Sequence, residues 1–228
     1  MRMTKHTQSR LPFELQAVLF DLDGTLIASE IDFAAMKRGV LEIAARHGVS
    51  DATLVALDIL GVIKESAGRL DAARAEALKA EAEAFLTEIE VRACLEAKPF
   101  PGACELLQKL AAEGIPVGIV TRNCRASADA VLSQFHLPHD LLLTRNDVAN
   151  TKPHPEHLLV ALRFLEAEPS HALMVGDHRM DIEGGKRAGV FTVGILAPDR
   201  PADFFDELKP DLVVRSLQEV MEWIFPSP

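Results

Sequence analysis

Acidic and hydroxyl side chains stand at the ends of three short apolar runs in this chain. The first run ends in Asp21 and Asp23, and two later runs end in Thr121 and Asp177. Ligands of open α/β sheets bind beyond the carboxyl ends of the strands, so we expect these side chains to converge. Clustered carboxylates repel one another unless a cation bridges them, and oxygen ligands suit Mg²⁺. A single Asp at a strand end often only caps a helix or forms a turn, so the prediction depends on the whole set.

The elements that must position these residues alternate between strands and helices. Apolar runs typical of buried strands cover residues 17–23, 116–121, 141–144, 172–177, 190–195 and, more weakly, 212–215. Helical patterns lie between them, at residues 103–113, 126–135, 156–166 and 181–188. Gly114 and Gly189 follow two of these patterns, as expected where a helix ends. The alternation predicts an α/β fold with a doubly wound parallel sheet.

The interval from residue 29 to residue 97 differs, because it contains no strand-like run. Its pattern indicates amphipathic helices near residues 32–47, after Asp51, and over the Ala- and Glu-rich residues 71–96. Residues 98–102 (KPFPG) then break the chain. We predict an α/β core domain of residues 1–28 and 98–228, with an all-helical cap domain, residues 29–97, inserted after the first strand. The alternative is a long packed helical crossover.

Composition limits the class of protein. The 228 residues are 48% hydrophobic and 25% charged, which is ordinary for a globular chain. No apolar segment approaches the roughly 20 residues that span a bilayer, so we expect no membrane partner. The net charge of −10 disfavours a nucleic-acid partner and requires a phosphate site to concentrate its cations locally. The sequence makes no prediction of oligomeric state.

Two features bear on localisation. The three cysteines show neither metal-ligand spacing nor a disulfide pattern, which favours a reducing, cytoplasmic environment. Residues 1–10 are polar and mildly basic, and no apolar signal-peptide core follows them. We therefore interpret them as a leader rather than a targeting sequence.

Four motifs in order resemble those of the haloacid dehalogenase superfamily. They are residues 21–26 (DLDGTL), Thr121, Lys152-Pro153, and the stretch from Gly176-Asp177 to Asp181. The resemblance extends from Ala17 onward, and the helical insertion after the first motif is similar to the helical-cap subfamily. Within that subfamily the pattern looks like a phosphoglycolate phosphatase.

The resemblance implies a catalytic and metal role for each acid. Asp21 would be the nucleophile that forms an aspartyl-phosphate, and Asp23 the general acid and then the base. Mg²⁺ would be held by Asp21, the backbone carbonyl of Asp23, and Asp177. Asp181 would orient metal-bound water or Lys152 rather than bind the metal itself.

The resemblance also implies a phosphate-binding set. Thr121 and the backbone N–H of Arg122 would bind the phosphate, and Lys152 would add a fixed positive charge. The side chains of Arg122 and Asn123 are candidates to reach the substrate. Of the histidines, His178 is the strongest candidate because it follows Asp177, whereas surface or packing roles are favoured for the others. Cys124 is interpreted as structural.

Asp23 discriminates among the chemistries of the superfamily. Dehalogenases and phosphonoacetaldehyde hydrolases lack an acid two residues after the nucleophile, so Asp23 favours Mg²⁺-dependent hydrolysis of a small phosphomonoester. A phosphosugar mutase keeps this acid and stays open as an alternative. A phospho-accepting receiver module, which is a signalling domain, is much shorter and is disfavoured. For substrate choice we expect a bend at residues 61–69, where Lys64 or Arg69 meets a carboxylate or second phosphate.

Overall fold

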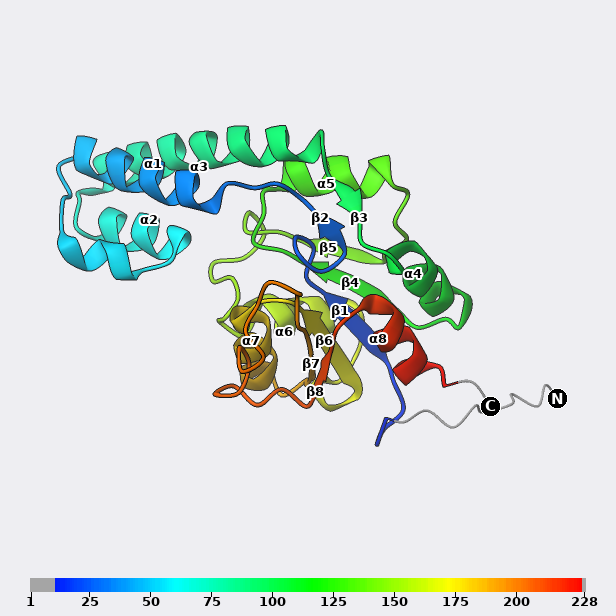
Figure 1. Ribbon diagram of the computed structural model, residues 1–228. Coiled ribbons are helices and arrows are strands. Elements are labelled where there is room, and N and C mark those ends of the chain that lie inside the picture. Colours follow the sequence, from blue (N-terminus) through cyan, green and yellow to red (C-terminus); the bar gives the residue numbers. More distant parts are fainter. Residues whose placement is uncertain (1–10, 227–228) are drawn as a thin grey trace. The chain divides into compact units, whose positions relative to one another are not determined.

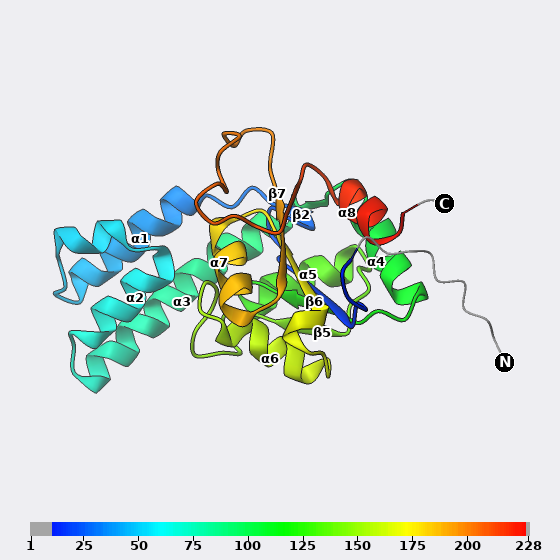
Figure 2. The ribbon, with the colours of Figure 1, turned by 90° about the horizontal axis from the view of Figure 1, so that it is seen from below.

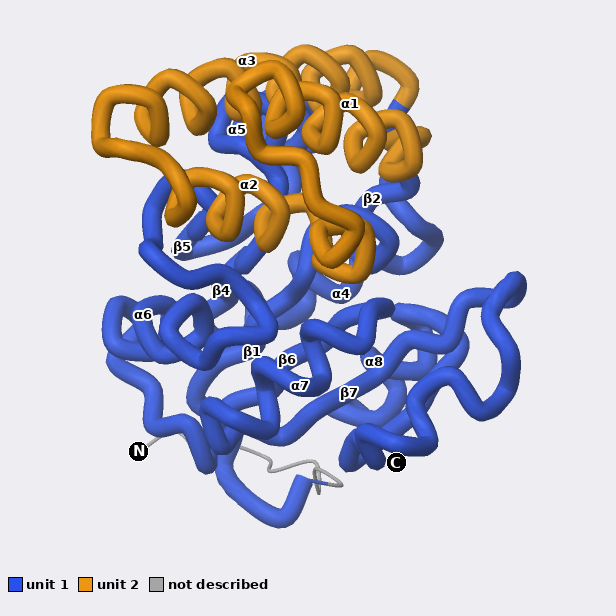
Figure 3. The backbone as a smooth tube through the Cα atoms, turned by 90° about the vertical axis from the view of Figure 1, so that its left-hand side faces the viewer, with its two compact units in different colours: residues 1–29, 97–228 blue, residues 30–96 orange. Residues whose placement is uncertain are grey.

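The computed structural model describes residues 11–226, so the predicted leader lies outside the described residues. The chain divides into two compact units, shown in different colours in Figure 3. One unit, which we call the core unit, runs up to Ser29 and resumes at Ala97; the other, the helical unit, is Glu30–Glu96. That the helical unit serves as a cap remains a prediction.

Six strands form the main sheet of the core unit (Figure 1). In chain order they are β1 (Ala17–Phe20), β4 (Val117–Val120), β5 (Leu141–Leu143), β6 (Ala172–Gly176), β7 (Phe191–Ile195) and β8 (Leu212–Val214). All neighbours are parallel, and the spatial order is β5-β4-β1-β6-β7-β8. The chain thus builds outward from β1 on one side and then on the other, which confirms the predicted doubly wound sheet.

Helices lie on both faces of this sheet (Figure 2). They are α4 (Ala103–Ala112), α5 (Arg125–Gln134), α6 (Glu156–Phe164), α7 (Arg179–Ala188) and α8 (Leu217–Ile224). α4 packs against α8, and α6 packs against α7. Leu158 and Leu162 of α6 join Leu19 of β1 and Met174 of β6 in one buried cluster, so an apolar helix face covers the sheet.

A second, two-stranded sheet pairs the core segments that come just before and just after the helical unit in the sequence. β2 (Ile27–Ala28) pairs antiparallel with β3 (Lys98–Pro99), and the N–H of Phe100 donates to the carbonyl of Leu26 at 2.9 Å. The sequence predicts only a chain break at residues 98–102. Two-residue strands are too short to show the alternation by which a strand is recognised.

The helical unit contains α1 (Phe33–Arg46), the 3₁₀-helix η1 (Ala52–Ala56), α2 (Ile59–Gly68) and α3 (Ala72–Cys94). Each begins after an Asp whose carboxylate accepts a backbone N–H, and such a cap fixes where a helix starts. Among the described residues, no helix combines the length and the apolar character needed to cross a bilayer.

The predicted bend at residues 61–69 is wrong, because α2 runs through this segment to Gly68 and Arg69 is its C-cap. Gly61 lies in the first turn, where its N–H donates to Asp58 at 3.0 Å, and Gly68 is the last helical residue. Both glycines therefore sit at helix ends, where they cost the helix little. Arg69 lies 2.7 Å from Asp51 and 2.9 Å from Glu65, so its charge is engaged within the helical unit. A substrate role for Lys64 or Arg69 remains a prediction.

Candidate active site

Asp21 directly follows β1, one of the two central strands of the sheet. Its N–H donates to the carbonyl of Val175 in β6 at 2.9 Å, which fixes the backbone at this point. Oδ1 accepts a hydrogen bond from Lys152 Nζ at 2.7 Å. Burial raises the pKa of the Asp21 carboxyl, and Lys152 partly offsets this effect. The predicted nucleophile is thus a buried carboxylate with a cation beside it.

A tight turn after Asp21 brings the first motif against the fourth. Gly24 has φ 87°, and a Cβ at this position would lie 2.4 Å from Asp177 Oδ2. The adjacent Thr25 donates from Oγ1 to Asp177 Oδ1 at 3.2 Å. Only glycine tolerates both the left-handed backbone and this close approach, so Gly24 is required for Asp177 to stand beside the turn.

Asp23 has a different environment from Asp21. Its Oδ1 accepts a hydrogen bond from Ser29 Oγ at 2.7 Å, and its Oδ2 accepts one from Asn123 Nδ2 at 2.9 Å. Burial raises the pKa of Asp23, and the two hydrogen bonds oppose that rise. Both carboxylate oxygens thus accept hydrogen bonds from neutral donors, and the metal role predicted for the backbone carbonyl of Asp23 remains a prediction.

The loop after β4 is held by its own polar groups. The N–H of Thr121 donates to the carbonyl of Leu143 at 2.9 Å, and its Oγ1 accepts from the N–H of Asn123 at 3.0 Å. Asn123 Oδ1 in turn accepts from the N–H of Cys124 at 2.7 Å. The sequence assigns Asn123 to the substrate, whereas its observed contacts tie this loop to Asp23. A substrate contact by Asn123 remains a prediction.

Lys152 lies between two carboxylates in the interior. Its side chain is 1% exposed, and Nζ lies 2.7 Å from both Asp21 Oδ1 and Asp181 Oδ1. Burial opposes a charge on the amine, but Asp181 and Asp21 raise the pKa of Lys152 above its ordinary value. Lys152 is therefore an ammonium ion held at a fixed place next to Asp21.

His157 is a site residue that sequence reasoning missed. It is fully buried, and its Nδ1 accepts a hydrogen bond from the backbone N–H of Lys152 at 3.4 Å. Burial, followed by the charge of Lys152, lowers the pKa of His157 to about 3, so the imidazole is neutral. The five-residue spacing from Lys152 carries no known signal, and only the fold shows that this ring supports the lysine.

Asp177 and Asp181 come from the junction of β6 and α7. Burial, with the charges of Asp21 and Asp181, raises the pKa of Asp177 to about 7. Asp181 Oδ2 accepts the N–H of His178 at 3.0 Å, and His178 Nδ1 accepts the N–H of Met180 at 3.2 Å. This reciprocal capping starts α7 at Arg179, two residues before the predicted start.

The three acids Asp21, Asp177 and Asp181 each place one oxygen within 4.8 Å of the others. Both oxygens of Asp181 are already used, by Lys152 and by the N–H of His178. Asp21 and Asp177 are therefore the better-placed ligands. Burial and the repulsion between these acids together raise the pKa of Asp177 to about 7, and such an all-oxygen set fits a hard divalent cation such as Mg²⁺.

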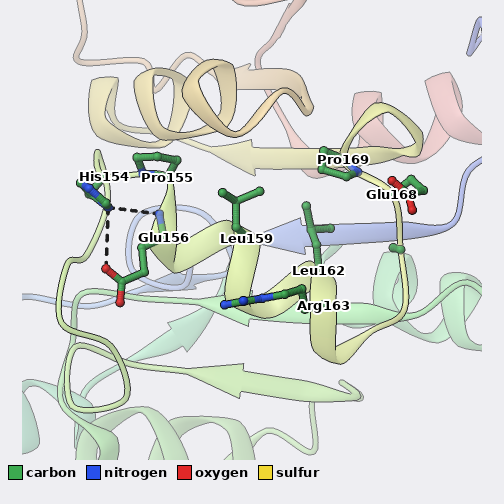
Figure 4. Close-up of a pocket in the computed structure, with 9 residues that line it drawn as sticks. His154, Pro155, Glu156, Leu159, Leu162, Arg163, Glu168 and Pro169 are labelled. Carbon is green, nitrogen blue, oxygen red and sulfur yellow. Dashed lines mark hydrogen bonds and ion pairs between the residues drawn. The ribbon is translucent and has the colours of Figure 1, made fainter.

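A separate surface pocket of about 520 Å³ lies along α6 (Figure 4). It is lined by the apolar side chains of Leu159 and Leu162 and by the charged side chains of Glu156, Arg163 and Glu168. None of the predicted site residues lines this pocket, so we assign it no part in the chemistry.

The sequence matches the family model of haloacid dehalogenase-like hydrolases over residues 18–195. The match contains all four motifs and more than half of the chain. The chain belongs to the haloacid dehalogenase-like hydrolase family. The predicted resemblance is thereby confirmed, and the chain is an enzyme of the hydrolase class.

Relatives of this hydrolase carry phosphatase names. The pyrophosphatase PpaX of Halalkalibacterium halodurans is 32% identical over 214 residues, which are 92% of this chain and 96% of that protein. A haloacid dehalogenase-like hydrolase from Bacteroides fragilis has a TM-score of 0.68 and 26% identity, over 91% of this chain and 100% of that one. A structure from Haemophilus somnus, named a phosphoglycolate phosphatase, has a TM-score of 0.62 over 92% and 98% of the chains, and its 20% identity supports likeness of fold alone. The curated relative and the Haemophilus somnus structure thus carry phosphatase names, and this chain is a hydrolase of the same family.

Proposed function

We propose that this hydrolase is a Mg²⁺-dependent phosphatase and hydrolyses a small phosphate ester through an aspartyl-phosphate on Asp21. The observation that carries the proposal is the contrast between two carboxyls two residues apart. Burial raises the pKa of both carboxyls, but Asp21 is paired with the ammonium of Lys152, which opposes that rise, whereas the hydrogen-bond partners of Asp23 are neutral donors. Such a contrast favours an ionised nucleophile beside a protonated acid.

The first step forms a bond between Asp21 and phosphorus. A carboxylate oxygen of Asp21 attacks phosphorus, while Lys152 Nζ stays within hydrogen-bonding distance of Oδ1, at 2.7 Å. The bond from phosphorus to the leaving oxygen breaks, and Asp23 gives its proton to that oxygen. Thr121, the N–H of Arg122 and Lys152 would bind the phosphoryl oxygens. Mg²⁺ on Asp21, Asp177 and the carbonyl of Asp23 would neutralise their charge.

The second step restores Asp21. Asp23, now ionised, takes a proton from water as the water oxygen attacks phosphorus. The bond between phosphorus and Asp21 breaks, inorganic phosphate leaves, and both carboxyls return to their starting states. Ser29 and Asn123 keep Asp23 in place through both steps, because each holds one of its oxygens.

The substrate is a small-molecule phosphate ester or anhydride. Phosphoglycolate and other phosphomonoesters are the candidates that the motifs favour. The pyrophosphatase name of the 32%-identical relative adds inorganic pyrophosphate, whose leaving group is itself a phosphate. A phosphosugar mutase would use the same residues, but it would pass the phosphoryl group to a second substrate oxygen instead of water.

Replacing the nucleophile tests this proposal. Asp21→Asn should abolish release of phosphate from a panel of phosphomonoesters and pyrophosphate, because an amide does not attack phosphorus. Asp129→Asn, a change on the exposed face of α5, is the matched control and should keep wild-type rates. Removing Mg²⁺ with a chelator should stop wild-type turnover.

Two outcomes would count against the proposal. Substantial turnover by Asp21→Asn would remove the nucleophile assignment. Transfer of phosphate to a sugar phosphate from its bisphosphate, without release of inorganic phosphate, would favour the mutase.

A further inference from the structure

The side chain of Arg122 crosses the carboxyl edge of the sheet. Arg122 lies two residues beyond β4, and its Nη1 contacts the sulfur of Met180 in the first turn of α7, beyond β6. β1 lies between β4 and β6. A side chain that joins these two points must pass the end of β1, where Asp21 stands. The guanidinium therefore lies across the carboxyl end of β1, at the edge of the sheet that carries Asp21.

The backbone beneath this side chain is anchored. Arg145 donates from Nη1 to the carbonyl of Arg122 at 3.2 Å, and its own N–H donates to the carbonyl of Asn123 at 3.3 Å. Arg145 is only 9% exposed, so this support is fixed within the core unit. A guanidinium on an anchored backbone loses less freedom when it binds a ligand.

A second guanidinium reaches the same edge from the segment after β7. Arg200 lies over the ring of Phe204, 4.9 Å from its centroid, and Phe204 meets the ring of His178 edge-on at 6.5 Å. Arg179 donates from Nη1 to the carbonyl of Phe204 at 3.0 Å, which ties this segment to α7.

The site has little free positive charge for a second phosphate, and these two arginines could supply it. Lys152 is already shared between Asp21 and Asp181, so its charge is largely balanced before any substrate arrives. A substrate with a second phosphate brings further negative charge on the side of the leaving group. Arginine suits such a group because its planar fork matches phosphate oxygens.

We propose that Arg122 and Arg200 bind a phosphate on the leaving group. The preferred substrates would then be small compounds in which one bridging oxygen joins two phosphates. In the reaction, Asp21 attacks one phosphorus and the bond from that phosphorus to the bridging oxygen breaks. The departing phosphate takes the electron pair together with the proton of Asp23, and the guanidiniums stabilise its charge. This inference depends on the proposed function, because it assumes the attack by Asp21.

The test compares two substrates in the full-length enzyme with Mg²⁺. Inorganic pyrophosphate has a phosphate leaving group, whereas p-nitrophenyl phosphate has none. We expect Arg122→Gln to lower kcat/KM for pyrophosphate by about 10- to 100-fold, the value of one hydrogen bond to a charged group. The loss with p-nitrophenyl phosphate should be much smaller. Arg200→Gln should shift the ratio in the same direction by a smaller factor, because its side chain is exposed.

Control variants separate this subsite from other effects. Arg125→Gln, in the next helix and paired with Asp147 at 2.6 Å, should leave the ratio between the two substrates unchanged. Arg200→Gln alters an exposed side chain and keeps the test open if Arg122→Gln folds poorly.

Three results would overturn the inference. One is an equal loss with both substrates in the Arg122 and Arg200 variants, and another is a wild-type kcat/KM for pyrophosphate no higher than for p-nitrophenyl phosphate. The third is an equal loss of phosphoglycolate and pyrophosphate turnover, which would mean that the subsite binds carboxylates as well. In each case loss of both activities in Asp21→Asn would leave the proposed function standing.

Discussion

Neutral polar side chains hold the charged side chains of this site in position. Asn123 and Ser29 occupy both oxygens of Asp23, and the imidazole of His157 accepts the backbone N–H of Lys152. None of these three adds charge to a site that already holds several carboxylates. Their effect is to fix where the acid and the ammonium stand, which matters because small displacements of reacting groups cost much in rate.

His157 should make the folded enzyme sensitive to acid. Its pKa falls from the usual 6.5 to about 3 on folding, so the unfolded chain takes up a proton in this range that the folded chain does not. The stability contribution is complete above pH 6.5 and declines as the pH falls toward 3, by up to about 1.4 kcal/mol per pH unit. In His157→Gln, urea unfolding at pH 7.5 and pH 5 should differ less than in the wild type.

His154→Gln is the control for this measurement, because its side chain is 53% exposed. It should retain the wild-type difference between the two pH values. A His157→Gln variant with an unchanged difference would mean that other groups cause the acid sensitivity.

At the scale of elements, the site is built from strand ends and the turns that follow them. β1, β4 and β6 are neighbours, so their carboxyl ends bring together Asp21, Thr121 and Asp177. The turn at Gly24 and the capped start of α7 then set the side chains within hydrogen-bonding distance. Short polar turns on rigid strands give the precision that catalysis needs.

Gly24→Ala should damage the site more than the fold. The new Cβ would lie 2.4 Å from Asp177 Oδ2, so the carboxylate must move. The left-handed backbone itself costs about 1–2 kcal/mol. We expect a loss of that size in the free energy of unfolding and a much larger Mg²⁺ concentration for half-maximal activity.

Gly114→Ala provides the matched control for this change. Gly114 also has a positive φ, 72°, but no atom lies within 4 Å of a Cβ built there. The variant should therefore lose stability and keep the wild-type Mg²⁺ dependence. Equal Mg²⁺ dependence in the two variants would contradict the close approach of Gly24 to Asp177.

At the scale of the whole molecule, the chain combines a net charge of −10 with a reaction on phosphate, which is also negative. The core unit gathers four acids, Asp21, Asp23, Asp177 and Asp181, around one buried lysine. Such a cluster stores repulsion in the folded state, and a bound cation relieves it. The proposed binding of Mg²⁺ would thus be coupled to the stability of the fold.

Mg²⁺ should raise the melting temperature of the wild-type enzyme. Binding to the folded state alone stabilises by about 2.7 kcal/mol at a concentration 100 times the Kd. Asp177→Asn removes one ligand and part of the repulsion, so its melting temperature without Mg²⁺ should be equal to or above that of the wild type. Its response to Mg²⁺ should be lost, as measured by scanning calorimetry. An equal response in both proteins would place the cation elsewhere.

The sequence by itself determined the sheet, the helical insertion and the residues of the four motifs. Each of these features depends on residues that are close together in the sequence: apolar runs, glycines that follow helices, and acids at the end of a strand. It misplaced the bend at residues 61–69, because glycines near helix ends resemble those that break a helix.

Only the tertiary structure decided which groups Asn123, His157 and Arg122 contact. Asn123 contacts an acid 100 residues away, and the path of Arg122 depends on β1 lying between β4 and β6. Local spacing does not encode such contacts, because they arise when strands distant in sequence become neighbours in the sheet. The motifs identify the groups that we propose to react, and the strand order decides which side chains hold them in place.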